Sequence, residues 1–170
     1  SSDLRPGMTG MPTGMPTGMA PTPAGERVIN RHVALLFRMG ERYLNRQLAG
    51  SGVTSGTAPL LLELREQGQR QLTAIATAIG VDKAHVTRSV RALENAGYVA
   101  VSPGAGGGRS LSVTLTPSGE EVVIRIETAM LAWIDIVSAG VEPKELATVN
   151  AVFDRFYTNA RAHLEIAPAP

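Results

Sequence analysis

Between residues 72 and 95, apolar residues recur at helical spacing, and a strand-like alternation of apolar and polar residues follows. This pattern predicts two consecutive helices. The first ends at Gly80, which adopts a positive φ without steric cost, and the second begins after Asp82, a residue type that caps helix N-termini. Residues 98–115 then predict two short strands joined by a Gly-rich loop. A helix-turn-helix followed at once by a two-stranded wing is typical of proteins that contact duplex DNA.

The two helices are expected to pack through a shared apolar underside, and small Ala76 allows their close approach. The apolar set comprises Ile75, Ile79, Val81, Val86, Val90 and Leu93. With these residues inward, the opposite face of the second helix carries Ala84, Arg88, Arg91 and Asn95, flanked by His85 and Thr87.

The opposite face of that second helix is basic and rich in hydrogen-bond donors. Residues 83–91 hold three formal positive charges and no acid, which suits a groove walled by phosphates. Arginine binds guanine through two hydrogen bonds, and threonine either hydrogen-bonds a base edge or offers its methyl group to thymine. A basic stripe also occurs on ordinary solvated helices, so the DNA interpretation depends on the wing that follows.

The predicted wing carries a single charge. Four glycines occupy positions 104–108, and Arg109 follows them. A lone arginine on a hairpin beside a basic helix suits the minor groove of A·T-rich DNA, where the potential is most negative. A Gly-rich loop could instead hold a nucleotide phosphate, but no GxxxxGK[ST] or GxGxxG pattern opens a helix here.

These motifs together resemble the MarR (multiple antibiotic resistance regulator) family of winged helix-turn-helix transcription factors. Residues 76–81 read ATAIGV, residues 86–97 read VTRSVRALENAG, Arg109 follows, and residues 113–119 read VTLTPSG. The resemblance extends over about residues 26–165 and is strongest in the middle. It implies a dimeric, bacterial, cytoplasmic DNA-binding regulator associated with the nucleoid, often a repressor that a small ligand or an oxidant releases.

The chain departs from the family pattern at two positions of the wing. Many members carry an Asp two residues before the wing arginine, where it orients the guanidinium, and this chain has Gly107. A basic residue is common at the start of the wing, and this chain has Val101. We therefore expect Arg109 to be less preorganised, so that its ordering weakens DNA binding.

Composition excludes several kinds of site. The chain of 170 residues is 44% hydrophobic and has no apolar run of membrane-spanning length, so a single soluble domain is expected. Only 4% of residues are aromatic, which argues against a base-stacking platform for single strands. The absence of cysteine excludes disulfides, thiolate metal ligands and thiol-based oxidant sensing.

Charge is segregated along the chain although its net value is only +1. Residues 26–70 carry seven basic and four acidic groups, residues 71–116 four and two, and residues 117–170 four and eight. A positive front and an acidic rear fit a protein that presents one side to phosphate.

The pattern outside the winged segment predicts long helices and a separate tail. Residues 1–25 contain a TGMP repeat and are interpreted as a flexible tail without signal-peptide features. Helices are expected from Glu26 to about residue 49, from 57 to 67, from 117 to 140 and from about 142. The resulting division is 1–25 tail, 26–53 N-terminal dimerisation helix, 54–116 DNA-binding domain (recognition helix about 83–96, wing about 99–115), 117–165 C-terminal dimerisation helices and 166–170 tail.

The apolar stripes of the outer helices exceed what a small winged domain can bury, which predicts an intertwined homodimer. A dimer would place two recognition helices about one DNA turn, roughly 34 Å, apart and read a pseudo-palindrome. The residues expected to contact DNA are Thr54, Ser55, Thr57, Thr73, Lys83, Ala84, His85, Thr87, Arg88, Arg91, Asn95, Arg109 and Ser110. Those at positions 54–57 are expected to offer N–H groups to phosphate at a helix N-terminus.

Ligand and metal sites are weakly indicated. The resemblance implies a pocket for small aromatic acids or lipophilic molecules, for which Arg38, Arg42, Tyr43 and Trp133 are candidates; the same four could be ordinary interface residues. His32 and His163 near the ends of the first and last helices could bind zinc with Glu26 or Glu165, but no close ligand spacing supports this. No cofactor is expected to be required.

No nucleophile elbow, metal cluster or paired acids indicate catalysis, so the chain is not expected to be an enzyme. Two other functions use the same fold. One is a non-specific architectural DNA-binding protein, which sequence discrimination against competitor DNA would exclude. The other is a winged domain for protein contacts, in which Lys83, Arg88 and Arg91 would be dispensable.

Overall fold

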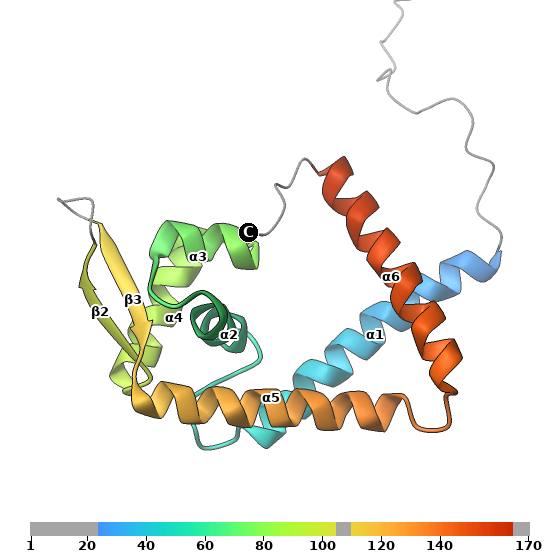
Figure 1. The fold of residues 1–170 in the computed structure, drawn as a ribbon, viewed down its shortest axis with the longest axis horizontal. Helices are drawn as coiled ribbons and strands as arrows, with labels where there is room; N and C mark the ends of the chain where they lie inside the picture. Colours follow the sequence, from blue (N-terminus) through green and yellow to red (C-terminus); the bar gives the residue numbers. More distant parts are fainter. Residues whose placement is uncertain (1–23, 105–109, 165–170) are drawn as a thin grey trace, which may run out of the picture. The chain divides into compact units, whose positions relative to one another are not determined.

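The computed structural model describes residues 24–104 and 110–164, with the backbone alone for residues 24–30. The chain divides into two units, Ser1–Phe37 and Arg38–Pro170, and the boundary falls within the first helix. Six helices and three short strands make the described part mainly α, which confirms the predicted fold class (Figure 1). In chain order they are α1 (Ala24–Gln47), α2 (Ala58–Gln67), β1 (Arg70–Gln71), α3 (Leu72–Ile79), α4 (Lys83–Asn95), β2 (Val99–Pro103), β3 (Leu111–Leu115), α5 (Pro117–Val137) and α6 (Pro143–His163).

The wing belongs to a three-stranded antiparallel sheet with strand order β1-β3-β2. The hairpin of β2 and β3 was predicted, and its register pairs Val101 with Val113. Strand β1 was missed: it pairs Arg70 with Val113 and Gln71 with Ser112 on the other edge of β3. A two-residue strand has no alternation to detect, and its partner lies some forty residues away, so only the folded chain reveals it.

The helix-turn-helix forms as its residue types predict. Gly80 ends α3 in the left-handed conformation (φ 71°, ψ 33°), where a Cβ would be strained. Ala76 is buried where α3 meets α4, and its carbonyl accepts hydrogen bonds from the N–H groups of Gly80 and Val81. The sharp turn therefore needs only one residue outside ordinary φ/ψ space.

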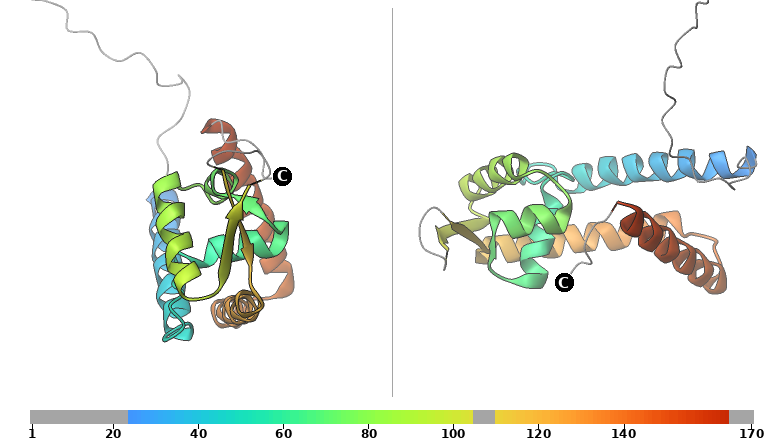
Figure 2. Two further views of the ribbon diagram at one scale, coloured as in Figure 1. Left: turned by 90° about the vertical axis from the view of Figure 1, so that its left-hand side faces the viewer. Right: turned by 90° about the horizontal axis from the view of Figure 1, so that it is seen from above.

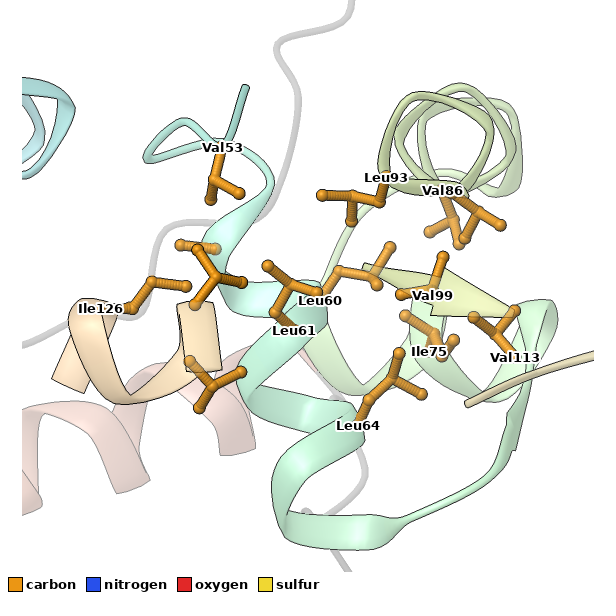
Figure 3. Close-up of a cluster of buried hydrophobic side chains, with 14 of the residues drawn as sticks. Val53, Leu60, Leu61, Leu64, Ile75, Val86, Leu93, Val99, Val113 and Ile126 are labelled. Carbon is orange, nitrogen blue, oxygen red and sulfur yellow. The ribbon is translucent and has the colours of Figure 1, made fainter. Parts of the chain in front are cut away.

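One hydrophobic core joins the winged elements to the start of α5. Figure 3 shows Leu60 and Leu61 of α2 at the centre of this cluster, with Ile126 of α5 approaching from one side. Side chains from α3, α4 and the sheet close the other side, and the fully buried members include Ile75, Val86, Leu93 and Val113. Burying each such aliphatic side chain contributes roughly 1.5–3 kcal/mol, so this core fixes the orientation of α4.

Helix α5 begins directly after β3, with Thr116 as its N-cap. The Thr116 hydroxyl accepts a hydrogen bond from the N–H of Gly119 at 3.0 Å, and Thr before Pro is a sequence typical of a helix start. The first half of α5 buries Val122, Val123 and Ile126 in the core. Beyond Ala129 its large apolar side chains are exposed: Met130, Leu131, Ile134, Ile136 and Val137.

Helix α6 has no buried residue among those described. It begins with Glu142, whose N–H donates to the Glu145 carboxylate at 3.0 Å, and Pro143 follows. The pattern predicts an apolar stripe on this helix, of which Val149, Phe153, Phe156 and Ala160 are exposed and Leu146 is half-buried. None of the helices in the described ranges combines the length and the apolarity needed to cross a membrane.

Candidate nucleic-acid interface

Helix α4 lies at the edge of the winged region, drawn in yellow-green in both views of Figure 2. Its inward side buries Val86, Ser89, Val90 and Leu93 against the core. The buried side of α4 is therefore the one that the spacing of its apolar residues predicted. On its outward side Lys83, Ala84, Arg88, Arg91 and Asn95 are exposed, with His85 and Thr87 half-buried at the margins.

The basic side chains of α4 are not engaged in ion pairs. Within the described ranges, ion pairs join Arg65 to Glu120 and Arg70 to Glu63, and neither involves α4. One acid, Glu94, lies exposed near the C-terminal end of the helix. The first two and a half turns thus present three positive charges that form no ion pair, which favours the approach of phosphates.

Asp82 fixes the N-terminus of α4. Its carboxylate accepts a hydrogen bond from the N–H of His85 at 2.7 Å. This hydrogen bond, with a smaller contribution from the charge of Arg88, holds the pKa of Asp82 below its ordinary value of 3.8. The cap therefore stays ionised near neutral pH, and the orientation of the first turn does not depend on DNA.

Two threonines predicted to contact DNA already use their backbone or hydroxyl groups within helices. The Thr87 hydroxyl donates to the carbonyl of Lys83 at 2.8 Å. Thr73, exposed in the first turn of α3, accepts through its carbonyl from the Thr77 hydroxyl at 3.1 Å. Thr73 thus keeps its own side chain available, whereas the hydroxyl proton of Thr87 is committed to the helix.

Much of the wing tip lies outside the described residues. Arg109, the predicted minor-groove contact, and Gly107 both fall in the range 105–109, so that prediction stays untested. Ser110 is described: its carbonyl accepts from the N–H of Gly104 at 2.8 Å and closes the hairpin beyond the strand pairs.

The structure gives other hydrogen-bond partners to backbone donors of the predicted phosphate-binding segment before α2. The N–H of Thr54 donates to the Thr57 hydroxyl, and that of Ser55 to the side-chain carbonyl of Asn45, at 3.0 and 2.7 Å. The N–H groups of Thr57 and Ala58 both donate to the carbonyl of Thr54. In this turn the N–H groups of Thr54, Ser55 and Thr57 are therefore engaged within the chain rather than directed at a phosphate.

The structure brings together two of the four effector candidates. Tyr43 of α1 and Trp133 of α5 lie with ring centroids 5.4 Å apart, tilted by 33°. Gly40 allows this contact, because a Cβ there would lie 3.1 Å from the indole Nε1 of Trp133. Arg38 and Arg42, on the same segment of α1, are exposed.

The structure describes no cluster of metal-ligating side chains around the two histidine candidates, His32 and His163. His32 belongs to the first unit and His163 to the second, and both are exposed. Glu26 and Glu165 lie among residues whose side chains are not described. Among the side chains that the structure describes, no group of three or more His, Asp or Glu is placed to hold a metal ion.

Comparison with known proteins agrees with this geometry. Residues 53–111, from the turn before α2 to the start of β3, match the model of the MarR family. This segment is similar to MarR-family domains. Among curated proteins, the chain is similar to the HTH-type transcriptional regulator BilQ of Clostridioides difficile (strain CD3), with 29% identity over 91 residues. That match covers 54% of this chain and 62% of BilQ, so the chain spans less than two thirds of this relative.

Solved structures show the same MarR-type fold over most of the chain. A MarR transcriptional regulator from Methanosarcina mazei Go1 superposes with a TM-score of 0.75 and 20% identity, covering 83% of this chain and 99% of its own. Sco3205 from Streptomyces coelicolor, solved in complex with DNA, gives a TM-score of 0.71 at 20% identity, covering 85% and 92%. Both extend beyond the matched domain into the flanking helices.

Sequence reasoning missed the residues that hold the MarR-type domain in place around α4. The side-chain amide N–H of Asn45 donates to the Ser55 hydroxyl at 3.1 Å. The side-chain carbonyl of Asn45 accepts from the backbone N–H of Ser55. The Tyr98 hydroxyl donates to the carbonyl of Ser51 at 2.8 Å. An asparagine near a helix end and a tyrosine after a glycine carry no local signal of these distant partners.

Proposed function

We propose that this chain is a sequence-selective, double-stranded DNA-binding transcriptional regulator that acts as a homodimer. The observation that carries the proposal is the outward face of α4, where Lys83, Arg88 and Arg91 are exposed and take part in none of the ion pairs of the described residues. The opposite side of this helix is buried in the core, and Asp82 caps its N-terminus. The DNA complex of Sco3205, a protein of the same fold, supports this use of the domain.

Helix α4 would lie in the major groove, which admits one α-helix. Arg88 and Arg91 would read guanine or flank the bases, and Lys83 would contact phosphate at the N-terminal end. Asp82 holds the first turn in place before binding, so the ordering cost falls on the arginine side chains alone.

A homodimer would supply the second reading helix. The support is the exposed apolar surface of α6 and the distal half of α5, which a single chain leaves in water. Two copies related by a dyad would set their α4 helices about one DNA turn apart and recognise a pseudo-palindromic operator.

We further propose repression by operator occupancy, relieved by a small molecule. The stack of Tyr43 and Trp133 beside Arg38 and Arg42 suits an aromatic carboxylate. Because Trp133 is the sole tryptophan, its fluorescence reports such a ligand directly. Titration with benzoate-type acids should shift or quench its emission and weaken DNA binding in parallel; a ligand-independent spectrum across the series would remove the proposed site.

Selection of bound duplexes from a random library by the purified chain tests the function itself. At about 150 mM salt non-specific electrostatic binding is weakened, and an inverted repeat with half-sites about one turn apart is expected. Binding without any motif would favour an architectural protein, and no binding would favour a domain for protein contacts.

A further inference from the structure

Near its N-terminal end, the outward face of α4 carries methyl groups beside the charged Lys83. The Thr87 Oγ1 donates to the carbonyl oxygen of Lys83, one turn earlier, at 2.8 Å. Staggering about the Cα–Cβ bond then places the Thr87 methyl in a different direction from the hydroxyl. A hydroxyl whose proton is bound to the helix cannot also donate it to a base edge.

Ala84 adds a second methyl group to the same surface. It is exposed, and residues three apart are neighbours on a helix, so its Cβ lies beside Thr87. Arg88 follows at the next turn from Ala84 and adjoins Thr87 in sequence. The face thus pairs a small apolar surface with a guanidinium that can bind guanine.

We propose that Thr87 and Ala84 read the 5-methyl group of a pyrimidine in the major groove, which in unmodified DNA is thymine. This inference rests on the proposed function and specifies what that surface recognises. Thymine presents its C5 methyl and O4 in the major groove, whereas cytosine presents an amino donor and no methyl. Of the four bases, only thymine offers an apolar group to match two side-chain methyls.

The expected change in DNA affinity is small and follows from the number of methyl groups that are buried. Burying one methyl group corresponds to about a fourfold change in affinity, and two half-sites that each bury one would give about 15-fold. The same methyl occurs in 5-methylcytosine, so a cytosine methylated at the read position should regain most of the affinity of thymine.

The test measures the equilibrium affinity of the chain for the selected duplex and for modified duplexes. In each modified duplex, one thymidine per half-site is replaced by deoxyuridine, which lacks only the methyl group. The full-length chain is used with three substitutions. Thr87→Val keeps the methyl and loses the hydroxyl, and Thr87→Ser does the reverse. Thr128→Ser is the matched control, because its hydroxyl makes the same bond to the carbonyl of Ile124, at 2.7 Å, on α5.

The wild-type chain, Thr87→Val and Thr128→Ser should lose about 15-fold at one symmetric thymine pair, whereas Thr87→Ser, which keeps only the Ala84 methyl, should lose clearly less. Equal wild-type affinity for both duplexes at every position would overturn the inference and leave the proposed function intact. Discrimination that survives in Thr87→Ser but not in Thr87→Val would also overturn it, by showing that the hydroxyl reads the base. If the wild-type chain selects no duplex, the proposed function itself fails and the inference fails with it.

Discussion

The hydroxyl of Tyr98 donates a hydrogen bond to the backbone carbonyl of Ser51 across 47 positions of sequence, at 2.8 Å. Tyr98 stands between α4 and β2, and Ser51 lies in the turn between α1 and α2. The backbone carbonyl of Tyr98 also accepts from the N–H of Thr116, the N-cap of α5. One residue therefore links the α1–α2 turn, the connection between α4 and β2, and the start of α5.

Replacing Tyr98 with phenylalanine should destabilise the chain by about 1 kcal/mol, because a partly buried carbonyl loses its donor while the ring still packs. Urea denaturation followed by circular dichroism measures this loss. Tyr157→Phe is the control, since the hydroxyl of Tyr157 bonds Arg161 on an exposed part of α6. A Tyr98→Phe variant as stable as the control would show that the hydrogen bond contributes nothing.

Gly119→Ala should be among the most damaging single substitutions. A Cβ at this position would lie 2.1 Å from the carbonyl oxygen of Tyr98, and that oxygen cannot move without breaking the start of α5. We expect a loss of about 3 kcal/mol or more, or failure to fold. Gly56→Ala, where a Cβ meets only an ordinary contact at 3.7 Å, should leave the melting temperature nearly unchanged. Similar melting temperatures for both variants would contradict this packing.

The Asp82 cap should contribute to stability in a pH-dependent way. Because folding lowers the pKa of Asp82 below 3.8, the contribution of its charge is complete above the unfolded pKa and is lost as the pH falls through the lower folded pKa. The difference in melting temperature between wild type and Asp82→Ala should be constant above about pH 5 and narrow below about pH 4.

Asp82→Asn separates charge from capping, since asparagine caps a helix without ionising. Its advantage over Asp82→Ala should persist at low pH. If the wild-type advantage over Asp82→Ala is unchanged at pH 3, the ionised carboxylate does not provide the cap.

The apolar stripe of α6 should be required for dimerisation. Phe156→Glu places a charge on that stripe, and light scattering with size-exclusion chromatography should report a shift from dimer to monomer. Arg155→Glu, one position away and directed to the other side of the helix, should remain dimeric. A dimeric Phe156→Glu chain, or a monomeric wild type, would argue against the proposed interface.

Local signals in the sequence predicted most of the elements that form α4 and its surroundings. Gly80, Asp82 and Thr116 mark helix ends through their own backbone and side-chain chemistry, and the structure confirms all three. The period of the apolar residues also predicted which face of α4 is outward. These features depend on residues within one or two turns, so a single sequence contains them.

Long-range relationships could not be predicted in the same way. Strand β1 exists only because β3 offers it a partner, and Asn45 folds the 54–57 segment into a turn that consumes the donors assigned to phosphate. Arg65 of α2 pairs with Glu120 of α5, 55 positions later in the chain. Each depends on packing between segments that share no local pattern.

The most direct test of the account is the affinity of Arg88→Ala and Arg91→Ala for the selected duplex, compared with Arg155→Ala, an exposed arginine of α6. If the outward face of α4 reads DNA, each α4 variant should lose about 1–3 kcal/mol of binding free energy and relax selectivity at one base pair of each half-site, while the control binds as wild type. Unchanged affinity and selectivity in both α4 variants would contradict the central claim that this helix is the DNA-reading surface.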